Sequence, residues 1–317
     1  MPEVLARLGL PEATPATVRP LPSGAYHRHA VLATPNDAWL LRTCTGPQWG
    51  VPAAAQLARE HGTLRALEPT GVAPRPVALL EGDSAGARAV LVEELVSGRH
   101  LDYARDMAAL GAALAQVHAL TPLHLPRACA RDALLADGRA WLAAAEHAGE
   151  DDEAVALVRR LEAAAAAAPV APTTLVLVHT DLNAANVLVD RGARILDWDA
   201  ARLGPPEWDL AHALSPTTTH WDAATSCTLD PEDCEALLDA YVAAAGDRDA
   251  ARRAVARVPA LLAAVAFRAL AWCLGFAAQA RAGQLALEAR LAEALERYRR
   301  PEFVEHCLDV VGEPVAV

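Results

Sequence analysis

A predicted hairpin near the middle of the chain carries an amide and a carboxylate that could bind one metal ion together. Two short runs, 186–189 and 193–196, flank a turn-forming Asp-Arg-Gly sequence, which is typical of a tight antiparallel hairpin. With the turn centred between residues 191 and 192, Asn186 lies directly opposite Asp197. Opposed residues have Cβ atoms about 4.5–5.5 Å apart, so the two side chains could share a small hard cation. A slipped turn would still leave both at the same end of the hairpin.

A further carboxylate is expected beside this pair. The apolar run 175–178 ends in His179-Thr180-Asp181, which places Asp181 on a loop five residues before Asn186. A carboxylate there could accept the proton of a bound hydroxyl while the cation neutralises phosphate oxygens. The pattern therefore favours phosphoryl transfer over the simpler interpretation, a hairpin that happens to carry polar surface residues.

The charged residues exclude several other kinds of chemistry. The 317-residue chain has 28 basic residues, all arginine, against 40 acidic ones, for a net charge of −12. Without lysine, it has neither a Walker-type phosphate loop nor a Schiff-base nucleophile. The acidic balance and the lack of a basic run argue against nucleic-acid binding. The six cysteines are scattered without zinc-like spacing, so we expect free thiols.

The N-terminus and the most apolar segment favour a cytoplasmic protein. The first 15 residues lack the basic start and apolar core of a secretory signal. The longest apolar stretch, 258–280, contains Arg268 near its middle and owes much of its apolar character to alanine. We therefore expect a buried helix there rather than a membrane span, and no membrane partner.

The chain changes character near residue 100. Strand-like and turn-like segments dominate before it, and alanine- and leucine-rich helical periodicity dominates after it. This shift predicts an α+β protein with a smaller mixed lobe followed by a larger, mainly helical lobe. The expected strands are 17–21, 28–33, 38–42 and 89–95, and the expected helical stretches are 57–67, 107–120, 139–168 and 258–280.

The strings HTDLNAANVL and ILDWD resemble the catalytic and metal-binding motifs of the aminoglycoside phosphotransferase and choline kinase family, whose fold is protein-kinase-like. The resemblance implies a bilobal fold with a β-rich nucleotide-binding lobe over 1–97 and a hinge near 93–98. A helical catalytic and acceptor-binding lobe would follow over 98–317. Asp181 would be the catalytic base, and His179 would brace its loop.

The same resemblance assigns further residues of the catalytic lobe. Asn186 and Asp197 would be Mg²⁺ ligands, and Asp209 would be the buried aspartate that anchors the catalytic loop. Thr180 stands where family members usually carry glycine, and Asn183 where histidine is frequent. Neither departure removes a ligand, although each could alter the geometry of the loop.

A buried ion pair is expected in the N-terminal lobe. Arg42 ends the strand 38–42 where protein kinases place their ATP-phosphate lysine, and many members of this family are similar in using arginine. Glu60 lies on the apolar face of its helix, between Leu57 and Leu64. An inward-facing carboxylate needs a partner, and Arg42 is the candidate. The alternative is that Glu60 lies at the edge of that face and reaches water.

The resemblance also places the nucleotide. The segment PSGAYHRH would cover the phosphates, through its backbone amides and through Ser23 and Gly24. The segment VEELVSG would be the hinge, where the Glu94 carbonyl and the Val96 amide hold the adenine edge. The expected cofactors are ATP, with GTP as an alternative, and Mg²⁺.

The acceptor pocket is expected to be acidic. Residues 203–247 contain nine acids and no basic residue, and in the family this region contributes to the acceptor site. An acidic pocket would favour a cationic acceptor, although a solvated acidic surface would give the same pattern. Trp208 and Trp221 could form an aromatic wall for a cation or pack in the core. Asp199 could support the metal or the acceptor, or be a turn residue.

Together these features predict an ATP-dependent O-phosphotransferase that moves the γ-phosphate to a hydroxyl of a small molecule. The acceptor would be an aminoglycoside-type antibiotic or an amino-alcohol or sugar metabolite. One alternative is a catalytically silent relative that only binds nucleotide. Another is a hydrolase with two metals held by His179, Asp181, Asp197 and Asp199, which would need further histidine ligands. The sequence predicts no oligomeric state.

Overall fold

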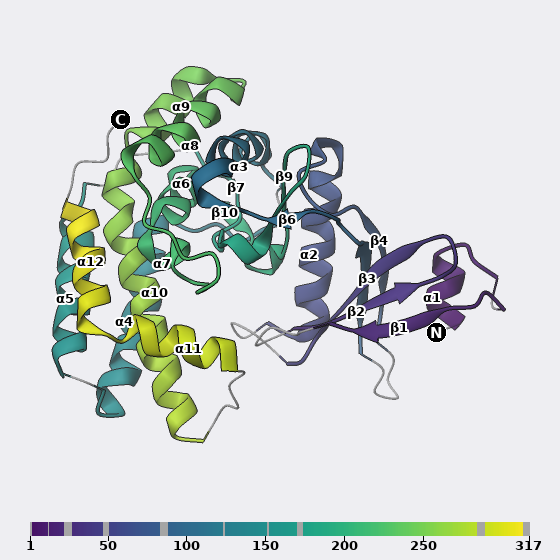
Figure 1. The fold of residues 1–317 in the computed structure, drawn as a ribbon, viewed down its shortest axis with the longest axis horizontal. Coiled ribbons are helices and arrows are strands. Elements are labelled where there is room, and N and C mark those ends of the chain that lie inside the picture. The colour runs from purple at the N-terminus through teal and green to yellow at the C-terminus, as the bar shows by residue number, and fades with distance from the viewer. Residues whose placement is uncertain are drawn as a thin grey trace.

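Strands dominate the first third of the chain and helices the rest (Figure 1). The computed structural model describes residues 2–11, 13–21, 27–46, 51–82, 88–122, 124–150, 152–169, 174–283 and 289–312. This division confirms the predicted bilobal α+β organisation. The expected lobe boundary at residues 97 and 98 stays a prediction, and it falls between strands β5 (Val90–Glu94) and β6 (Arg99–His100).

The N-terminal lobe is built on an antiparallel sheet of five strands in the order β1-β2-β3-β5-β4. Its members are β1 (Thr17–Pro20), β2 (His27–Ala33), β3 (Ala38–Cys44), β4 (Pro76–Leu80) and β5. All of these except β4 match predicted strands. Strands β2 and β3 form the expected hairpin, with His27 opposite Cys44.

Helices cover both faces of this sheet. Helix α2 (Ala53–Leu67) packs on one face against β3, β4 and β5. Helix α1 (Pro2–Arg7) contributes Val4 to a separate apolar cluster that also includes Leu41 of β3. Because neighbouring residues of a strand point to opposite faces, Arg42 points toward α2. The sheet therefore presents one arginine to the helix that carries Glu60.

The C-terminal lobe combines two small sheets with most of the helices. The sheets have the strand orders β6-β8-β9 and β10-β7. Their remaining strands are β7 (Val176–Val178), β8 (Val187–Val189), β9 (Ala193–Ile195) and β10 (Arg202–Gly204). The helices are α3 (Tyr103–Val117), α4 (Ala130–His147), α5 (Asp152–Ala167), α6 (Glu207–Leu214), α7 (Pro216–Thr219), α8 (Pro231–Ala244), α9 (Arg248–Val255), α10 (Val258–Arg281), α11 (Ala289–Tyr298) and α12 (Pro301–Gly312). Short 3-10 turns η1 (Glu68–Thr70), η2 (Ala184–Asn186) and η3 (Trp198–Ala200) complete the described elements.

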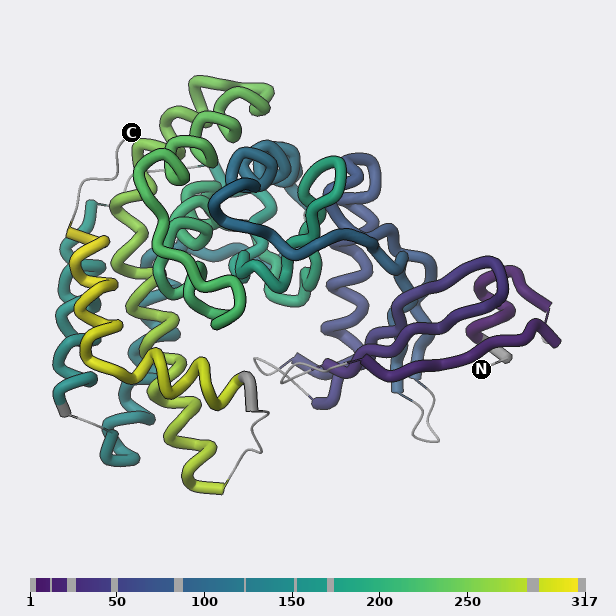
Figure 2. The backbone as a smooth tube through the Cα atoms, viewed as in Figure 1, coloured from purple at the N-terminus to yellow at the C-terminus, as the bar shows by residue number. Residues whose placement is uncertain are grey.

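Helix α10 lies in the core of the helical lobe. It packs against α4, α5 and α6, and the tube view shows it running beside α12 (Figure 2). Within the described residues it is the one helix long and apolar enough to cross a membrane, and 78% of its apolar window is buried inside the protein. Arg268 within it pairs with Asp137 of α4 at 2.8 Å. The predicted buried helix is therefore confirmed.

The stretch predicted as helical over 139–168 is two helices, α4 and α5. Gly149 lies between them with φ 71°, a left-handed conformation that ends a helix and that glycine adopts without strain. The next residue, Glu150, turns inward, and its buried carboxylate accepts hydrogen bonds from Arg281 and Arg299. The break therefore follows from a glycine and from ion pairs with distant residues.

Candidate active site

Asp209 fixes the backbone of the loop that carries the predicted base. Its fully buried carboxylate accepts hydrogen bonds from the backbone N–H groups of His179 and Thr180, both at 2.8 Å, and lies 3.2 Å from His118 Nε2. Burial alone would raise the pKa of Asp209, but the hydrogen bond with His118 and the neighbouring histidines hold that pKa below its usual value. The anchoring contact that the resemblance implies is present.

Thr180 has a left-handed backbone with φ 69°, which is strained for a β-branched residue. The same conformation would be unstrained for the glycine that is usual in the family. Two contacts hold the residue in place: its N–H donates to Asp209, and its hydroxyl donates to the Ala200 carbonyl at 3.3 Å. These contacts offset the strain.

We expect Thr180→Ala to be less stable than Thr180→Gly by about 1 kcal/mol. Both variants lose the hydroxyl's hydrogen bond to Ala200, but only glycine relieves the left-handed backbone. Denaturant unfolding of the two variants measures the difference. Equal midpoints would show that the backbone at this position is not strained.

His179 positions the loop through both ring nitrogens. Its Nδ1 accepts a hydrogen bond from the Asp181 N–H at 3.1 Å, so the proton lies on Nε2, which donates to the Leu196 carbonyl at 2.8 Å. The ring also lies edge-on to Trp198, with 4.6 Å between centroids. The neutral imidazole thus joins the base's loop to the strand end that precedes Asp197, which is a bracing role.

Two side-chain amides orient the carboxylate of Asp181. Asn183 donates to Oδ1 at 3.2 Å, and Asn186 donates to Oδ2 at 3.1 Å and to the Asp181 carbonyl at 2.9 Å. Asn183 therefore supplies a donor where histidine is frequent in the family. With its nitrogen facing Asp181, Asn186 keeps its amide oxygen for a different partner.

Arg42 forms the expected ion pair with Glu60. Its Nε lies 3.0 Å from Glu60 Oε2, and both side chains are buried, so Glu60 does not reach water. The Arg42 guanidinium also donates to the Asp197 carboxylate and lies 3.1 Å from His27 Nδ1. Burial opposes the charge on Arg42, but Asp197 and Glu60 outweigh burial and raise its pKa. The arginine therefore stays charged beside a predicted metal ligand.

The register of the β8–β9 hairpin differs by one residue from the prediction. Val187 pairs with Ile195, so the turn is centred on Arg191, and the residue opposite Asn186 is Leu196, whose N–H donates to the Asn186 carbonyl at 2.8 Å. Asp197 is therefore not directly opposite Asn186. It follows immediately, with a left-handed backbone at φ 64°.

The donors near Asp197 fit a hard divalent cation. Ligand atoms of Asp197, Asp199 and His27 lie within 4.8 Å of one another. Burial and the charge of Asp197 raise the pKa of Asp199 well above its usual value, which a divalent cation would counteract. Carboxylates together with the amide oxygen of Asn186 are ligands that Mg²⁺ prefers. Asp199, left open by the sequence, is thus part of this cluster rather than an ordinary turn residue.

Two of the predicted nucleotide-binding residues, Glu94 and Val96, lie where β5 leads into the connection to β6. Ser23 and Gly24 fall outside the described residues. The Glu94 carboxylate accepts two hydrogen bonds from Arg194, at 2.9 and 2.7 Å, and these lower its pKa. The predicted hinge is therefore tied to the hairpin that leads to Asp197.

Four residues of this network are not assigned to it by the sequence. Arg59 donates to the Asp199 carbonyl at 2.9 Å, and Tyr103 accepts from the Ala184 N–H at 3.1 Å and donates to the Thr218 carbonyl at 3.2 Å. The others are His27 and Arg194. The one available signal was for Arg194, a charged residue alternating with apolar neighbours in a predicted strand, which indicates an outward-facing side chain but names no partner.

Most of the acids between 203 and 247 have structural partners. Asp230 and Asp233 form a capping box at the start of α8, and Asp247 caps α9. Asp209 anchors the loop, and Glu207 lies 3.9 Å from Arg257. Asp222 also has a local partner, because its Oδ1 accepts a hydrogen bond from the Ala224 N–H at 3.1 Å. It lies four residues after Thr218, whose carbonyl accepts a hydrogen bond from the Tyr103 hydroxyl.

The two tryptophans serve packing. Trp208 is buried in the core and has Arg202 over its ring at 5.3 Å. Trp221 packs against Trp272 and Tyr298, with centroids 5.9 and 5.7 Å away. These contacts show core packing, which is one of the two roles that the sequence left open for these tryptophans.

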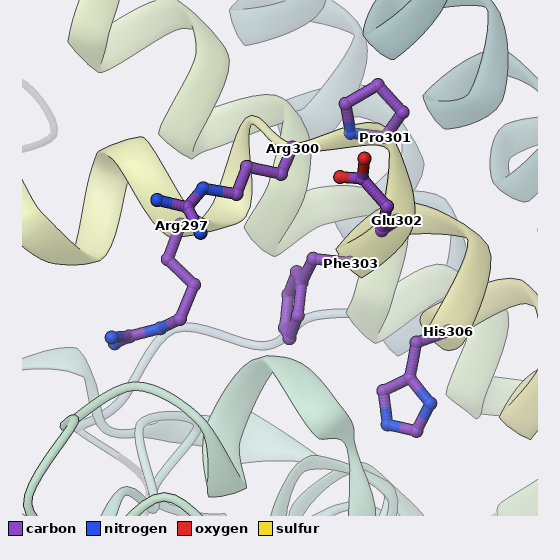
Figure 3. Close-up of a pocket in the computed structure, with 6 residues that line it drawn as sticks. All are labelled: Arg297, Arg300, Pro301, Glu302, Phe303 and His306. Atoms are coloured by element: carbon purple, nitrogen blue, oxygen red, sulfur yellow. The ribbon is translucent and has the colours of Figure 1, made fainter.

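An open hollow of about 780 Å³ lies where α11 meets α12 (Figure 3). Arg297, Arg300, Glu302, Phe303 and His306 line it together with Pro301. Of the predicted catalytic and nucleotide-binding residues that the structure describes, none does so, and Arg297 is engaged with the His220 and Trp221 carbonyls at 2.8 and 2.9 Å. The chemistry described above therefore lies elsewhere.

Three solved structures with the same fold are phosphotransferases or kinases of small molecules. A spectinomycin phosphotransferase, solved in complex with ADP and spectinomycin, is 15% identical over 92% of each chain, with a TM-score of 0.63. A choline/ethanolamine kinase family protein from Mesorhizobium loti is 19% identical over 99% of this chain and 100% of its own (TM-score 0.60). A macrolide 2′-phosphotransferase from Brachybacterium faecium is 21% identical over 95% of this chain and 96% of its own (TM-score 0.58). No curated protein matches the chain.

A family model covers most of the chain. The model described as the phosphotransferase enzyme family matches residues 17–258, a range that includes Arg42, Glu60, Asp181 and Asp197. The matched range thus holds both the buried ion pair and the loop anchored by Asp209. This protein belongs to the phosphotransferase enzyme family.

Proposed function

We propose that the protein transfers the γ-phosphate of ATP to a hydroxyl group of a small molecule, with Mg²⁺ as cofactor. The observation that carries the proposal is the continuous set of contacts from Glu60 through Arg42 to Asp197, beside an oriented Asp181. Arginine supplies the positive charge for phosphate oxygens in a chain without lysine. Bound Mg²⁺ would neutralise charge on the phosphates.

Four polar residues of the catalytic loop have roles in the proposed reaction. Asp181 would accept the proton of the acceptor hydroxyl as the phosphoryl group arrives. Asn183 and Asn186 hold its carboxylate by hydrogen bonds of 3.2 and 3.1 Å, and His179 fixes the backbone. Asn186 and Asp197 would hold the metal ion. The base is thereby oriented before substrate arrives.

The two alternatives receive less support. A silent nucleotide-binding relative would be expected to lack one of Asp181, Asn186 or Asp197, and all three are present. The two-metal hydrolase needs a free nitrogen on His179, but both ring nitrogens are engaged, one by the Asp181 N–H and the other by the Leu196 carbonyl. Phosphoryl transfer therefore remains the function that the geometry favours.

We further propose that the acceptor is cationic and that Asp222 contacts its positive group. The Tyr103 hydroxyl contacts Ala184, three residues after Asp181, and Thr218, four residues before Asp222, so both acidic segments meet at this side chain. One carboxylate oxygen of Asp222 accepts a hydrogen bond from the Ala224 N–H at 3.1 Å, as the capping acids of α8 and α9 accept from their own backbone donors. A carboxylate near the base favours an amine-bearing hydroxyl compound over a neutral one.

We expect Asp222→Asn to raise KM for a cationic acceptor about tenfold, the effect of losing about 1.4 kcal/mol of binding, with little change in kcat. The assay follows ADP release from MgATP, and in parallel GDP release from MgGTP, against aminoglycosides, choline, homoserine, thiamine and amino sugars. Asp239→Asn, an exposed acid on α8, is the matched control. An unchanged KM in Asp222→Asn would contradict the assignment of this carboxylate.

A further inference from the structure

A second cavity, of about 300 Å³, lies behind the catalytic loop, among α2, α4, α6 and α10. Thr180 lines it from the loop and Arg202 from the segment that follows Asp199. Asp181, Asn186 and Asp197 are absent from its lining, so it is a space distinct from the groups assigned to phosphoryl transfer. The roles proposed above for Asp181, Asn186 and Asp197 do not involve the arginines that line it.

Three arginines and one carboxylate line the cavity. Arg268 is paired with that carboxylate, Asp137, at 2.8 Å. Arg202 donates to the Ala200 carbonyl at 3.1 Å and lies over the Trp208 ring, but among the described residues it has no carboxylate within ion-pair distance. The lining therefore carries an excess of positive charge.

Arg59 adds an unsatisfied donor to this excess. Its terminal nitrogen donates to the Asp199 carbonyl at 2.9 Å, while its Nε is buried and has no hydrogen-bond partner. A buried guanidinium nitrogen without a partner is costly. Burial, and to a smaller extent the charges of Arg268 and Arg59, lower the pKa of Arg202 to about 10. An anion in the cavity would accept a hydrogen bond from Arg59 and would offset the unfavourable burial of the Arg202 charge.

Apolar side chains form much of the remaining lining. Leu134 of α4 and Val265 of α10 are examples, and Val51, Pro126 and Trp208 add further apolar surface. A free inorganic ion would leave these groups without contacts, whereas an organic anion would cover them. Guanidinium groups match the oxygens of a phosphate better than a point charge does, because their donors are fixed in a planar fork.

We propose that this cavity binds a small organic anion, with its phosphate group among Arg59, Arg202 and Arg268 and its apolar part between α4 and α10. Such a ligand would bridge α2, which carries Glu60, and the segment that follows Asp197. Its binding would hold the nucleotide-side helix against the metal-side segment without touching Asp181. The inference rests on the cavity and does not depend on the identity of the acceptor.

Calorimetric titration of the intact protein with phenyl phosphate tests the proposal. We expect binding to a single site, weakened at least tenfold in Arg202→Gln and in Arg59→Gln. Arg139→Gln is the matched control, because Arg139 lies on α4 and pairs with Glu162 at 2.6 Å, outside the cavity. Thermal unfolding of each variant establishes that it is folded. If only one of the two cavity variants folds, that variant alone is enough for the test.

Two further probes define the ligand. Inorganic phosphate should bind more weakly than phenyl phosphate, because it leaves the apolar lining bare, and benzoate should bind more weakly because it carries less charge. Undetectable binding of phenyl phosphate to the wild type would overturn the proposal. Wild-type affinity in both Arg202→Gln and Arg59→Gln would also overturn it, by placing the anion elsewhere, such as beside Arg42.

Discussion

An Asp181→Asn variant is expected to turn over about 10³-fold more slowly than the wild type, while it binds nucleotide with unchanged affinity. The substitution keeps the size of the side chain and its place between Asn183 and Asn186 but removes the only carboxylate that these two amides orient. An amide cannot accept the proton of the acceptor hydroxyl. The loss should therefore appear in kcat and leave nucleotide binding intact.

Steady-state kinetics and nucleotide titration of this variant separate the two effects. Asp190→Asn is a suitable control, because Asp190 is an exposed acid in the turn of the nearby hairpin. It should behave as the wild type in both measurements. A kcat within threefold of wild type in Asp181→Asn would refute the assignment of the base.

The second large effect is expected for Asp197→Asn. The wild-type protein should bind ADP more tightly when Mg²⁺ is present, and in the variant this enhancement should fall by about 10²-fold. Asp197 brings a carboxylate to the cluster with Asp199 and His27, and it also accepts a hydrogen bond from Arg42. Loss of its charge removes a strong ligand for a hard cation.

Titration of ADP with and without Mg²⁺ distinguishes the metal role from the role of the ion pair with Arg42. If Asp197 only held Arg42, its replacement would change ADP affinity equally in both conditions. A metal ligand predicts that the change is confined to the Mg²⁺ series. An unaltered Mg²⁺ dependence in the variant would contradict the metal assignment.

Local patterns correctly predicted four strands of the N-terminal sheet, the buried helix α10 and one long-range contact. Alternation and turn residues located the hairpin of β2 and β3, and helical spacing showed that Glu60 faces inward. The pair of Arg42 with Glu60 was expected from an inward carboxylate that needs a partner, together with the family resemblance that singles out Arg42. These inferences succeed because each depends on a few neighbouring residues or on a simple requirement for charge balance.

The incorrect predictions concern features that depend on distant contacts or on the geometry of a turn. The loop between β8 and β9 closes around three residues, with the Asp190 N–H 3.3 Å from the Gly192 carbonyl, and this shifts the register by one. Asp-Arg-Gly is compatible with either turn length, so the sequence does not specify the register. The left-handed backbone of Asp197 is likewise invisible in a sequence that carries no glycine there.

Residues that bridge the two lobes were also missed for a physical reason. Arg194 reaches Glu94, 100 positions away, and Arg59 reaches the carbonyl of Asp199, 140 positions away. A single sequence shows which side chains are charged but does not show which of them the fold brings together. The cavity behind the catalytic loop is a product of such contacts, since it draws its arginines from α2, β10 and α10.

In the proposed reaction, the protein transfers phosphate to a small-molecule hydroxyl with Asp181 as the base. The most direct test uses ATP labelled in its γ-phosphate, with Mg²⁺ and the acceptor panel, and separates labelled acceptor from labelled free phosphate. We predict labelled acceptor with the wild type and almost none with Asp181→Asn. Label that appears only as free phosphate, or equal labelling of the acceptor by both proteins, would contradict the account.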